Sequence, residues 1–332
     1  MTDKKVIIIT TGGTIAGIGN DTQTTGYTSG CLSASGLIDS IPAIKDIAPI
    51  EVIELCNINS DDITYDIWAK LVCLINARSK ENDIAGFVIT HGTDTLEETA
   101  FFLNLTVNTT KPVILTGAMR PSNAISPDGP FNLYQAICTV ISPNAIGKGV
   151  LVVFGSNIYS ARFVTKTNTY SLNAITGLDR GPIGTVIDDK VYFDYSFEGL
   201  HTIASEFNDL GLGDISRELS DIKIGYIYFS VGINMDSVKT SVENLEGVVL
   251  IGAGMGEYSK ELLEIVDELS QNNVPVVITS RNGSGIIPSN ALLSDKTIAS
   301  RHLSPQKSAI LLRLCLIKGY NTEKIRKIFE IY

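Results

Sequence analysis

The sequence predicts an α/β protein with two domains, and three observations lead to this prediction. First, its 332 residues exceed one ordinary compact core and suit two domains of about 150 residues each. Second, short apolar runs typical of buried strands alternate with helical segments, which predicts a mainly parallel sheet covered by helices. Third, the alternation stops in a mixed segment and then begins again. We therefore expect a larger N-terminal domain at 1–196, a linker at 197–219 and a smaller C-terminal α/β domain at 220–332.

Four short runs rich in β-branched residues predict the strands of the N-terminal domain. They cover residues 6–9, 86–90, 112–116 and 150–154. Between the second and third runs, Thr-Leu-Glu-Glu at 95–98 matches a capping box ahead of an apolar stretch and so predicts the start of a helix. A second helix is expected after the polar loop 120–130 and should end near Ile141. Residues 170–195 break the alternation with turns and short strand-like pieces.

The C-terminal domain repeats the alternation on a smaller scale. Strands are expected at 224–229, 248–251 and 274–278, with a helix near 260–270. Ser304 followed by Pro305 fits an N-cap with proline at the first helical position. A final helix should begin near Tyr320. Ligands of open α/β sheets bind beyond the carboxyl ends of the strands, so the residues that follow each strand are the candidates for function.

Composition and charge exclude several classes of function. The net charge of −10 lacks the basic footprint of a nucleic-acid-binding protein and gives no attraction to an anionic membrane surface. No apolar run approaches the roughly 20 residues that span a membrane. Five widely spaced cysteines and three distant histidines form no ligand pattern, so we expect neither a disulfide framework nor a metal site.

The start of the sequence favours a cytoplasmic protein. The apolar stretch at residues 6–9 is shorter than the roughly 7–15 apolar residues of a secretory leader. Cysteines without a pairing pattern agree with a reducing compartment. The alternative is a mature periplasmic form from which a leader has been removed.

The first candidate site follows the strand at 6–9, where residues 10–17 are Thr-Thr-Gly-Gly-Thr-Ile-Ala-Gly. Adjacent glycines allow a tight turn and a close approach of the backbone to a ligand. A dinucleotide fingerprint would need glycine at the position of Thr14, and no phosphate-binding Gly-Lys-Ser/Thr occurs. These absences argue against a nicotinamide-linked dehydrogenase, the alternative suggested by the fold alone. Local chemistry leaves two interpretations: a turn that presents the Thr14 hydroxyl, or a glycine turn with locally hydrogen-bonded threonines.

The second candidate site is Thr-His-Gly-Thr-Asp-Thr at 90–95. Thr93 and Asp94 stand where a strand gives way to a helix, and N–H groups at a helix start can bind an anion or oxyanion. Asp94 suits either a ligand ammonium group or a helix cap. His91 has no partner nearby in sequence and is interpreted as structural rather than as a base. Lys166, in a threonine-rich stretch, is by itself typical of an exposed strand residue.

Taken together, these motifs resemble the bacterial-type L-asparaginase family, which includes the glutaminase-asparaginases. The motifs that carry the resemblance are residues 11–17, 87–95, 117–121, 128–134, 164–168, 304–307 and 328–332. They extend over essentially the whole chain, and their order and spacing make the similarity specific. The resemblance implies hydrolysis of the side-chain amide of L-asparagine to L-aspartate and ammonia, without a metal or cofactor.

The resemblance implies two groups of catalytic residues. Thr14 matches the family's primary nucleophile, and Tyr27 matches the tyrosine beside it. Thr93, Asp94 and Lys166 match a second group, in which lysine and aspartate polarise a threonine hydroxyl. A threonine hydroxyl must lose its proton as it attacks, so a nearby phenol or desolvated lysine suits this chemistry. The implied intermediate is an acyl-enzyme ester at Thr14.

The resemblance also implies how the substrate is held. Ser60 matches the serine that contacts the substrate α-carboxylate, and Asp94 would pair with the α-ammonium group. Ala118 matches a residue whose backbone lies at the amide end of the substrate. Backbone N–H groups near Gly13 and Thr93 are the expected oxyanion hole.

Three positions depart from the family pattern. Asp61 stands where family members carry glutamine or glutamate, and its shorter side chain reaches less far toward the substrate ammonium group. Glu257 stands where the family usually has asparagine or serine contributed by the neighbouring subunit. Residues 290–292, Asn-Ala-Leu, occupy the place of the family's active-site glutamate. We hypothesise that Glu257 replaces this carboxylate across the subunit interface.

The resemblance further implies a homotetramer, a dimer of dimers in which the small domain of one chain completes the site of another. The loop 16–33 resembles the family's mobile lid, and it carries Tyr27. Two alternatives to a strict asparaginase stay open. One is a dual glutaminase-asparaginase, because an extra methylene shifts pocket preference by only about 1–3 kcal/mol. The other is a non-catalytic amino-acid sensor on the same scaffold.

Overall fold

The computed structural model describes residues 3–19, 26–28, 31–39, 41–210 and 215–332, without the side chains of Tyr27, Ala34, Ser35 and Leu37. The chain divides into two compact units, Met1–Leu212 and Gly213–Tyr332. Residues 211–214 of the linker expected at 197–219 lie outside the described residues, as do residues 20–25 and 29–30 of the expected lid loop.

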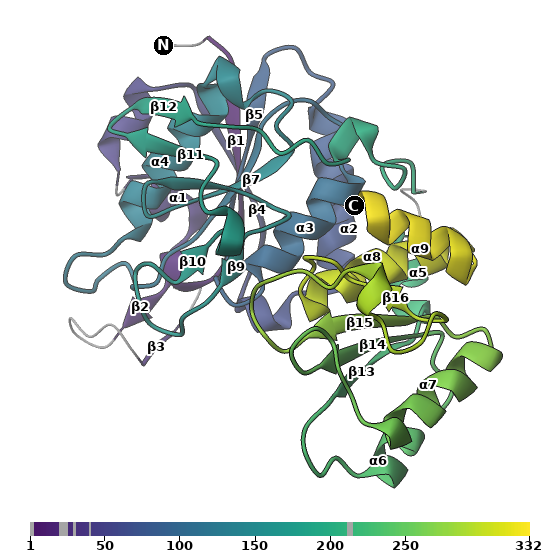
Figure 1. Cartoon of the computed structure of the whole chain (residues 1–332). Coiled ribbons are helices and arrows are strands. Elements are labelled where there is room, and N and C mark those ends of the chain that lie inside the picture. The colour runs from purple at the N-terminus through teal and green to yellow at the C-terminus, as the bar shows by residue number, and fades with distance from the viewer. Residues whose placement is uncertain (1–2, 20–25, 29–30, 40, 211–214) are drawn as a thin grey trace. The chain divides into compact units, whose positions relative to one another are not determined.

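A sheet of eight strands, counted over the described residues, forms the centre of the first unit (Figure 1). Its order is β12–β11–β8–β7–β6–β5–β1–β4. Strands β4, β1, β5, β6 and β7 run parallel, whereas β8, β11 and β12 are joined through antiparallel pairs. The strands are β1 (Lys5–Gly12), β4 (Ile50–Ile58), β5 (Ile84–Thr90), β6 (Val113–Thr116), β7 (Val150–Phe154), β8 (Asn157–Ser160), β11 (Gly184–Ile187) and β12 (Lys190–Phe193). The expected mainly parallel α/β architecture is confirmed.

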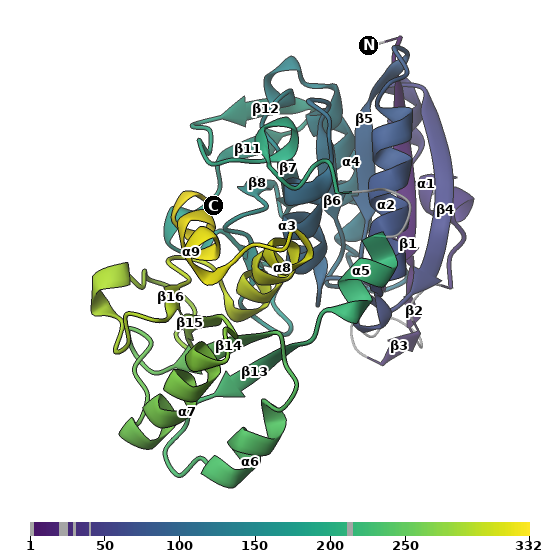
Figure 2. The same cartoon turned by 90° about the vertical axis from the view of Figure 1, so that its right-hand side faces the viewer.

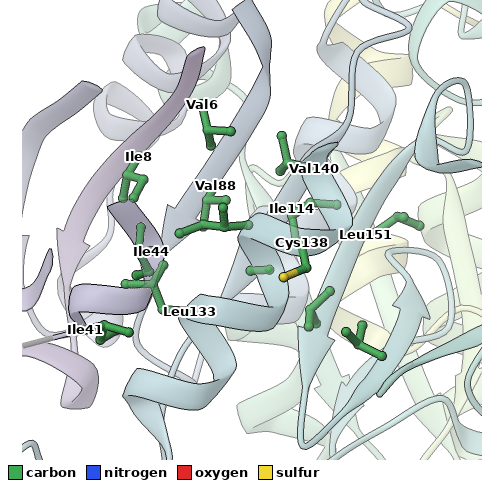
Figure 3. Packing of buried hydrophobic residues seen from close by; sticks show 14 of the residues in the cluster. Val6, Ile8, Ile41, Ile44, Val88, Ile114, Leu133, Cys138, Val140 and Leu151 are labelled. Atoms are coloured by element: carbon green, nitrogen blue, oxygen red, sulfur yellow. The ribbon is translucent and has the colours of Figure 1, made fainter. Parts of the chain in front are cut away.

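Helices cover this sheet. They are α1 (Ala34–Asp39), α2 (Tyr65–Arg78), α3 (Leu96–Thr106) and α4 (Gly129–Ile141). Helix α4 packs on one face, where its Leu133 joins Val6 and Val88 in a buried apolar cluster (Figure 3). Helix α3 packs against β6 and β7, and α2 packs against α3. The rings of Trp68 in α2 and Phe102 in α3 are stacked, with centroids 4.6 Å apart.

Two short antiparallel pairs lie outside the large sheet. They are β2 (Ile18–Gly19) with β3 (Tyr27–Thr28), and β9 (Thr165–Lys166) with β10 (Ile175–Thr176). The first pair brings the backbone of Tyr27 beside the segment that follows the glycine turn. The second pair gives Lys166 a fixed strand position.

The second unit contains a parallel sheet of four strands within its described residues, in the order β13–β14–β15–β16. Helices α6 and α7 lie on one face of this sheet, and α8 and α9 lie on the other (Figure 2). The elements are α5 (Ile215–Asp221), β13 (Ile224–Tyr228), α6 (Met235–Ser241), β14 (Gly247–Gly252), α7 (Lys260–Gln271), β15 (Val276–Ser280), β16 (Ile298–Ala299), α8 (Pro305–Ile317) and α9 (Thr322–Ile331). The predicted cap is confirmed, because the Ser304 side chain accepts from the Lys307 N–H.

Some local predictions are wrong, each for a physical reason. Neither β4 nor α2 is predicted, and in β4 the charged residues Glu51 and Glu54 interrupt the apolar run. The capping box at 95–98 does not form, because the Thr95 hydroxyl donates to the Ser60 carbonyl oxygen at 2.7 Å. The last predicted strand begins two residues later, because Pro275 has no N–H to donate to the ladder.

No helix in the described part of the chain is long and apolar enough to cross a membrane.

Candidate active site

The carboxyl ends of three neighbouring strands meet at one edge of the large sheet. Strand β1 pairs in parallel with β4 on one side and with β5 on the other, so the segments that follow all three strands come together. These segments line a cavity of about 210 Å³. Its lining residues are Gly13, Thr14, Asn59, Ser60, Asp61, Gly92, Thr93 and Asp94.

The turn after β1 requires glycine at two consecutive positions. Gly12 has φ of 100° and Gly13 has φ of 83°, in the region that side chains disfavour. A Cβ on Gly13 would lie 2.5 Å from the Cα and N atoms of Gly92. The turn therefore rests directly on the segment after β5. It delivers Thr14 to the cavity as a buried residue, 6% exposed, in the short 3₁₀ helix Thr14–Ala16.

The second expected group of residues is assembled by long-range contacts. The Lys166 ammonium Nζ lies 2.8 Å from Thr93 Oγ1 and 2.6 Å from Asp94 Oδ1. The Lys166 side chain is only 17% exposed, whereas that of Asp94 is 67% exposed. Lys166 is therefore not the exposed strand residue that its local sequence suggests. Asp94 does not cap α3, and its carboxylate instead pairs with Lys166.

Glu97 holds the backbone of Lys166 and was missed from the sequence. Its carboxylate accepts the Lys166 backbone N–H at 2.9 Å, and the residue is 4% exposed in the first turn of α3. A buried carboxylate at this position ties α3 to β9 and so sets the position of the lysine. The available signal was a charged residue within an otherwise apolar helical stretch.

His91 is buried behind the cavity and is hydrogen-bonded at both ring nitrogens. Nδ1 lies 2.7 Å from the Gly92 carbonyl oxygen, and Nε2 lies 2.9 Å from Thr99 Oγ1. Burial lowers the pKa of His91 to about 4, so the ring is neutral near pH 7. His91 does not line the cavity, which agrees with its interpretation as structural.

The expected substrate-binding residues occupy different places. Ser60 and Asp61 begin the 3₁₀ helix Ser60–Asp62 after β4 and line the cavity, Ser60 buried and Asp61 exposed. Ala118 is 1% exposed and is not among the lining residues. Its neighbour Gly117 approaches Thr93, since a Cβ there would lie 3.3 Å from Thr93 Cγ2.

The loop around Ala118 is held from helix α4. The Asp128 carboxylate accepts the Met119 N–H at 3.0 Å and the Arg120 N–H at 2.9 Å. Asn132 Nδ2 donates to the Gly117 carbonyl oxygen at 3.0 Å. These contacts clamp the backbone on both sides of Ala118.

Two expected site residues are not brought to the cavity by what the structure describes. The Tyr27 side chain lies outside the described residues. Glu257 lies in the second unit, where its backbone pairs with Ala253 and its side chain is exposed. The Gly13 N–H, near which an oxyanion hole is expected, already donates to the Ile58 carbonyl oxygen at 3.0 Å.

Among the described residues, no group of three or more His, Cys, Asp or Glu side chains is arranged to hold a metal ion. The cavity is therefore described by its hydroxyl, ammonium, carboxylate and backbone groups.

Comparisons with known proteins agree over nearly the full chain. The family sequence model described as "Asparaginase, N-terminal" matches residues 5–198, and "Glutaminase/Asparaginase C-terminal domain" matches residues 223–329. L-asparaginase 2 of Bacillus subtilis is 40% identical over 98% of this chain and 86% of that protein. The probable periplasmic L-asparaginase of Haemophilus influenzae is 37% identical over 98% of this chain and 92% of that protein.

A solved structure gives the same result. The crystal structure of a probable cytoplasmic L-asparaginase from Campylobacter jejuni is 36% identical, with a TM-score of 0.92. The similarity covers 99% of this chain and 100% of that one. The resemblance inferred from the motifs is thereby confirmed. The chain belongs to the asparaginase family.

Proposed function

We propose that this protein is an L-asparagine amidohydrolase that releases L-aspartate and ammonia. The observation that carries the proposal is the convergence of Thr14, Thr93, Asp94 and Lys166 on one cavity in a chain of the asparaginase family. The names of the similar proteins support the same activity.

The proposed reaction has two steps. The Thr14 hydroxyl attacks the side-chain amide carbon of asparagine, and its proton passes to the leaving nitrogen with help from the Tyr27 phenol. Ammonia leaves, and an ester joins the aspartyl group to Thr14. Water near Thr93 then attacks this ester, with Lys166 assisting removal of the water's proton. Aspartate leaves, and the Thr14 hydroxyl is restored.

The charges around the cavity suit the zwitterionic end of an amino acid. Asp61 and Asp94 present carboxylates, and Ser60 offers a hydroxyl donor for an α-carboxylate. Asp94 uses Oδ1 for Lys166, and a carboxylate has further acceptor sites for an ammonium group. We propose that Asp61 and Asp94 hold the α-ammonium group and that Ser60 holds the α-carboxylate.

The test is ammonia release from L-asparagine and, separately, L-glutamine, by wild type and Thr14→Ala. Thr139→Ala is the matched control, because the Thr139 hydroxyl is buried in α4 and donates to the Gln135 carbonyl oxygen. We expect release from asparagine by wild type and the control, and at least a 1,000-fold loss in Thr14→Ala. Comparable release from glutamine would make the protein a dual enzyme. Binding of asparagine without release would support the sensor alternative and refute the proposal.

We propose that the active form is a homotetramer in which the second unit of one chain, through Glu257, completes the site of another. Mixing inactive Thr14→Ala with inactive Glu257→Ala subunits should then restore activity, because some mixed sites contain both intact residues. An unchanged KM in Glu257→Ala would refute this role, and a monomer in mass measurements would refute the assembly.

We propose the cytoplasm as the compartment, since similar proteins carry both cytoplasmic and periplasmic descriptions and the apolar stretch near the start of the sequence is short. Fractionation of the source cells tests this, and activity recovered in a periplasmic fraction would overturn it.

A further inference from the structure

We propose that His91, held by Thr99 and Trp68, is a positioning residue that anchors the Gly92 carbonyl so that the Thr93 N–H faces the cavity. The inference rests on the proposed function, because it gives that N–H a part in stabilising the oxyanion. It assigns roles to three buried residues that take no part in the two reaction steps.

The hydrogen bonds determine the tautomer of His91. A carbonyl oxygen only accepts, so Nδ1, 2.7 Å from the Gly92 oxygen, must carry the proton. Nε2 is then an acceptor and takes the proton of the Thr99 hydroxyl at 2.9 Å. The Thr99 oxygen in turn accepts the Trp68 indole N–H at 2.8 Å. Every donor in this chain has an acceptor, and the chain ends at Gly92.

The geometry of the peptide bond carries the argument from Gly92 to Thr93. In a trans peptide the carbonyl and the following N–H point in opposite directions. Because the Gly92 oxygen is turned toward the imidazole, the Thr93 N–H is turned away from it. Thr93 lines the cavity, and within the described residues no protein acceptor takes its N–H. This leaves the group available to a ligand oxygen.

Close packing makes the same peptide important for both groups of catalytic residues. A Cβ on Gly92 would lie 2.8 Å from Ser60 Cβ and Oγ, and Gly13 rests on the other side of Gly92. Rotation of the Gly92–Thr93 peptide would therefore shift Thr93, Ser60 and the turn before Thr14 together. A misplacement of about 1 Å in such a site costs about 100-fold in rate.

The kinetic test compares variants that keep or remove the donor to Gly92. His91→Leu removes it, and we expect kcat for asparagine to fall about 10- to 100-fold with KM within threefold of wild type. His91→Asn places an amide N–H near the position of Nδ1, and it should recover most of the lost kcat. Recovery by asparagine distinguishes positioning from a general loss of stability. A kcat within twofold of wild type in His91→Leu, or no recovery in His91→Asn, overturns the inference.

A matched pair of threonines on α3 tests the next link. Thr99→Val removes the hydroxyl that fixes the tautomer, whereas Thr106→Val removes a buried hydroxyl that only donates to the Phe102 carbonyl oxygen. We expect kcat to fall about threefold to tenfold in Thr99→Val and to stay within twofold of wild type in Thr106→Val. Equal effects in both variants contradict the inference.

A spectroscopic measurement separates this inference from the proposed function. Solid-state ¹⁵N spectra of histidine-labelled protein contain three rings, and the His91→Asn spectrum identifies the signals of His91. We expect a neutral ring protonated at Nδ1 at pH 6. If wild type releases no ammonia, the proposed function fails and this spectrum decides the anchoring. A ring that is charged or protonated at Nε2 overturns it.

Discussion

Replacing Gly13 by alanine should disable the proposed nucleophile while leaving a folded protein. Gly13 has φ of 83° and ψ of −174°, a conformation that is essentially restricted to glycine. An alanine Cβ would lie 2.5 Å from two backbone atoms of Gly92, whereas ordinary contact begins at 3.4 Å. The turn must therefore move by 0.9 Å, the difference between 3.4 and 2.5 Å. Neither atom belongs to a flexible side chain, so Thr14 moves with the turn.

A displacement of this size has a large expected effect on rate. A misplacement of about 1 Å costs about 100-fold in kcat, which corresponds to about 2.7 kcal/mol in activation free energy. Backbone strain should add a loss of about 1–3 kcal/mol in the free energy of unfolding. The assay measures kcat and KM for ammonia release, together with the urea midpoint of unfolding.

Gly181→Ala is the matched control for backbone strain. Gly181 has φ of 64° and ψ of −167°, close to the conformation of Gly13, but a Cβ there would meet no atom within 4 Å. We expect it to lose stability without losing kcat. The reasoning is refuted if folded Gly13→Ala keeps kcat within threefold of wild type. It is also refuted if Gly181→Ala loses as much kcat as Gly13→Ala.

Two further predictions test other parts of the structure. Lys166→Met removes the ammonium group beside Thr93 and Asp94, and kcat for ammonia release should fall about 100- to 10,000-fold; a loss below tenfold would contradict its role in proton transfer. The Arg78 guanidinium lowers the pKa of the Glu51 carboxyl from 4.5 to about 2, so this ion pair should stabilise the fold above pH 4.5 and lose that effect as the pH falls toward 2. Since the Glu51 side chain is 30% exposed, we expect Glu51→Gln to lower the free energy of unfolding by about 1–2 kcal/mol at pH 7 and less at pH 3 in urea titrations; a difference independent of pH would contradict this.

Local patterns and tertiary contacts disagree most at the helix that follows β5. The spacing of Thr95 and Glu98 fits a capping box, yet the Thr95 hydroxyl donates to Ser60, a residue 35 positions earlier. The same segment places Glu97 against the backbone of Lys166, 69 positions later. A capping pattern describes contacts within one turn, so it cannot register a partner supplied by another loop.

The sequence by itself determined the α/β class, the two-domain organisation as an expectation, and the family, because these depend on apolar periodicity and on the order of motifs along the chain. The glycines at 12 and 13 also declared a special turn, since no other residue adopts positive φ so readily. Only the tertiary structure decided that Lys166 is buried against Thr93 and that His91 faces Gly92 rather than the cavity. These arrangements depend on parallel strands ending at one edge and on burial by α3, and contacts between residues so distant in sequence leave no periodic trace.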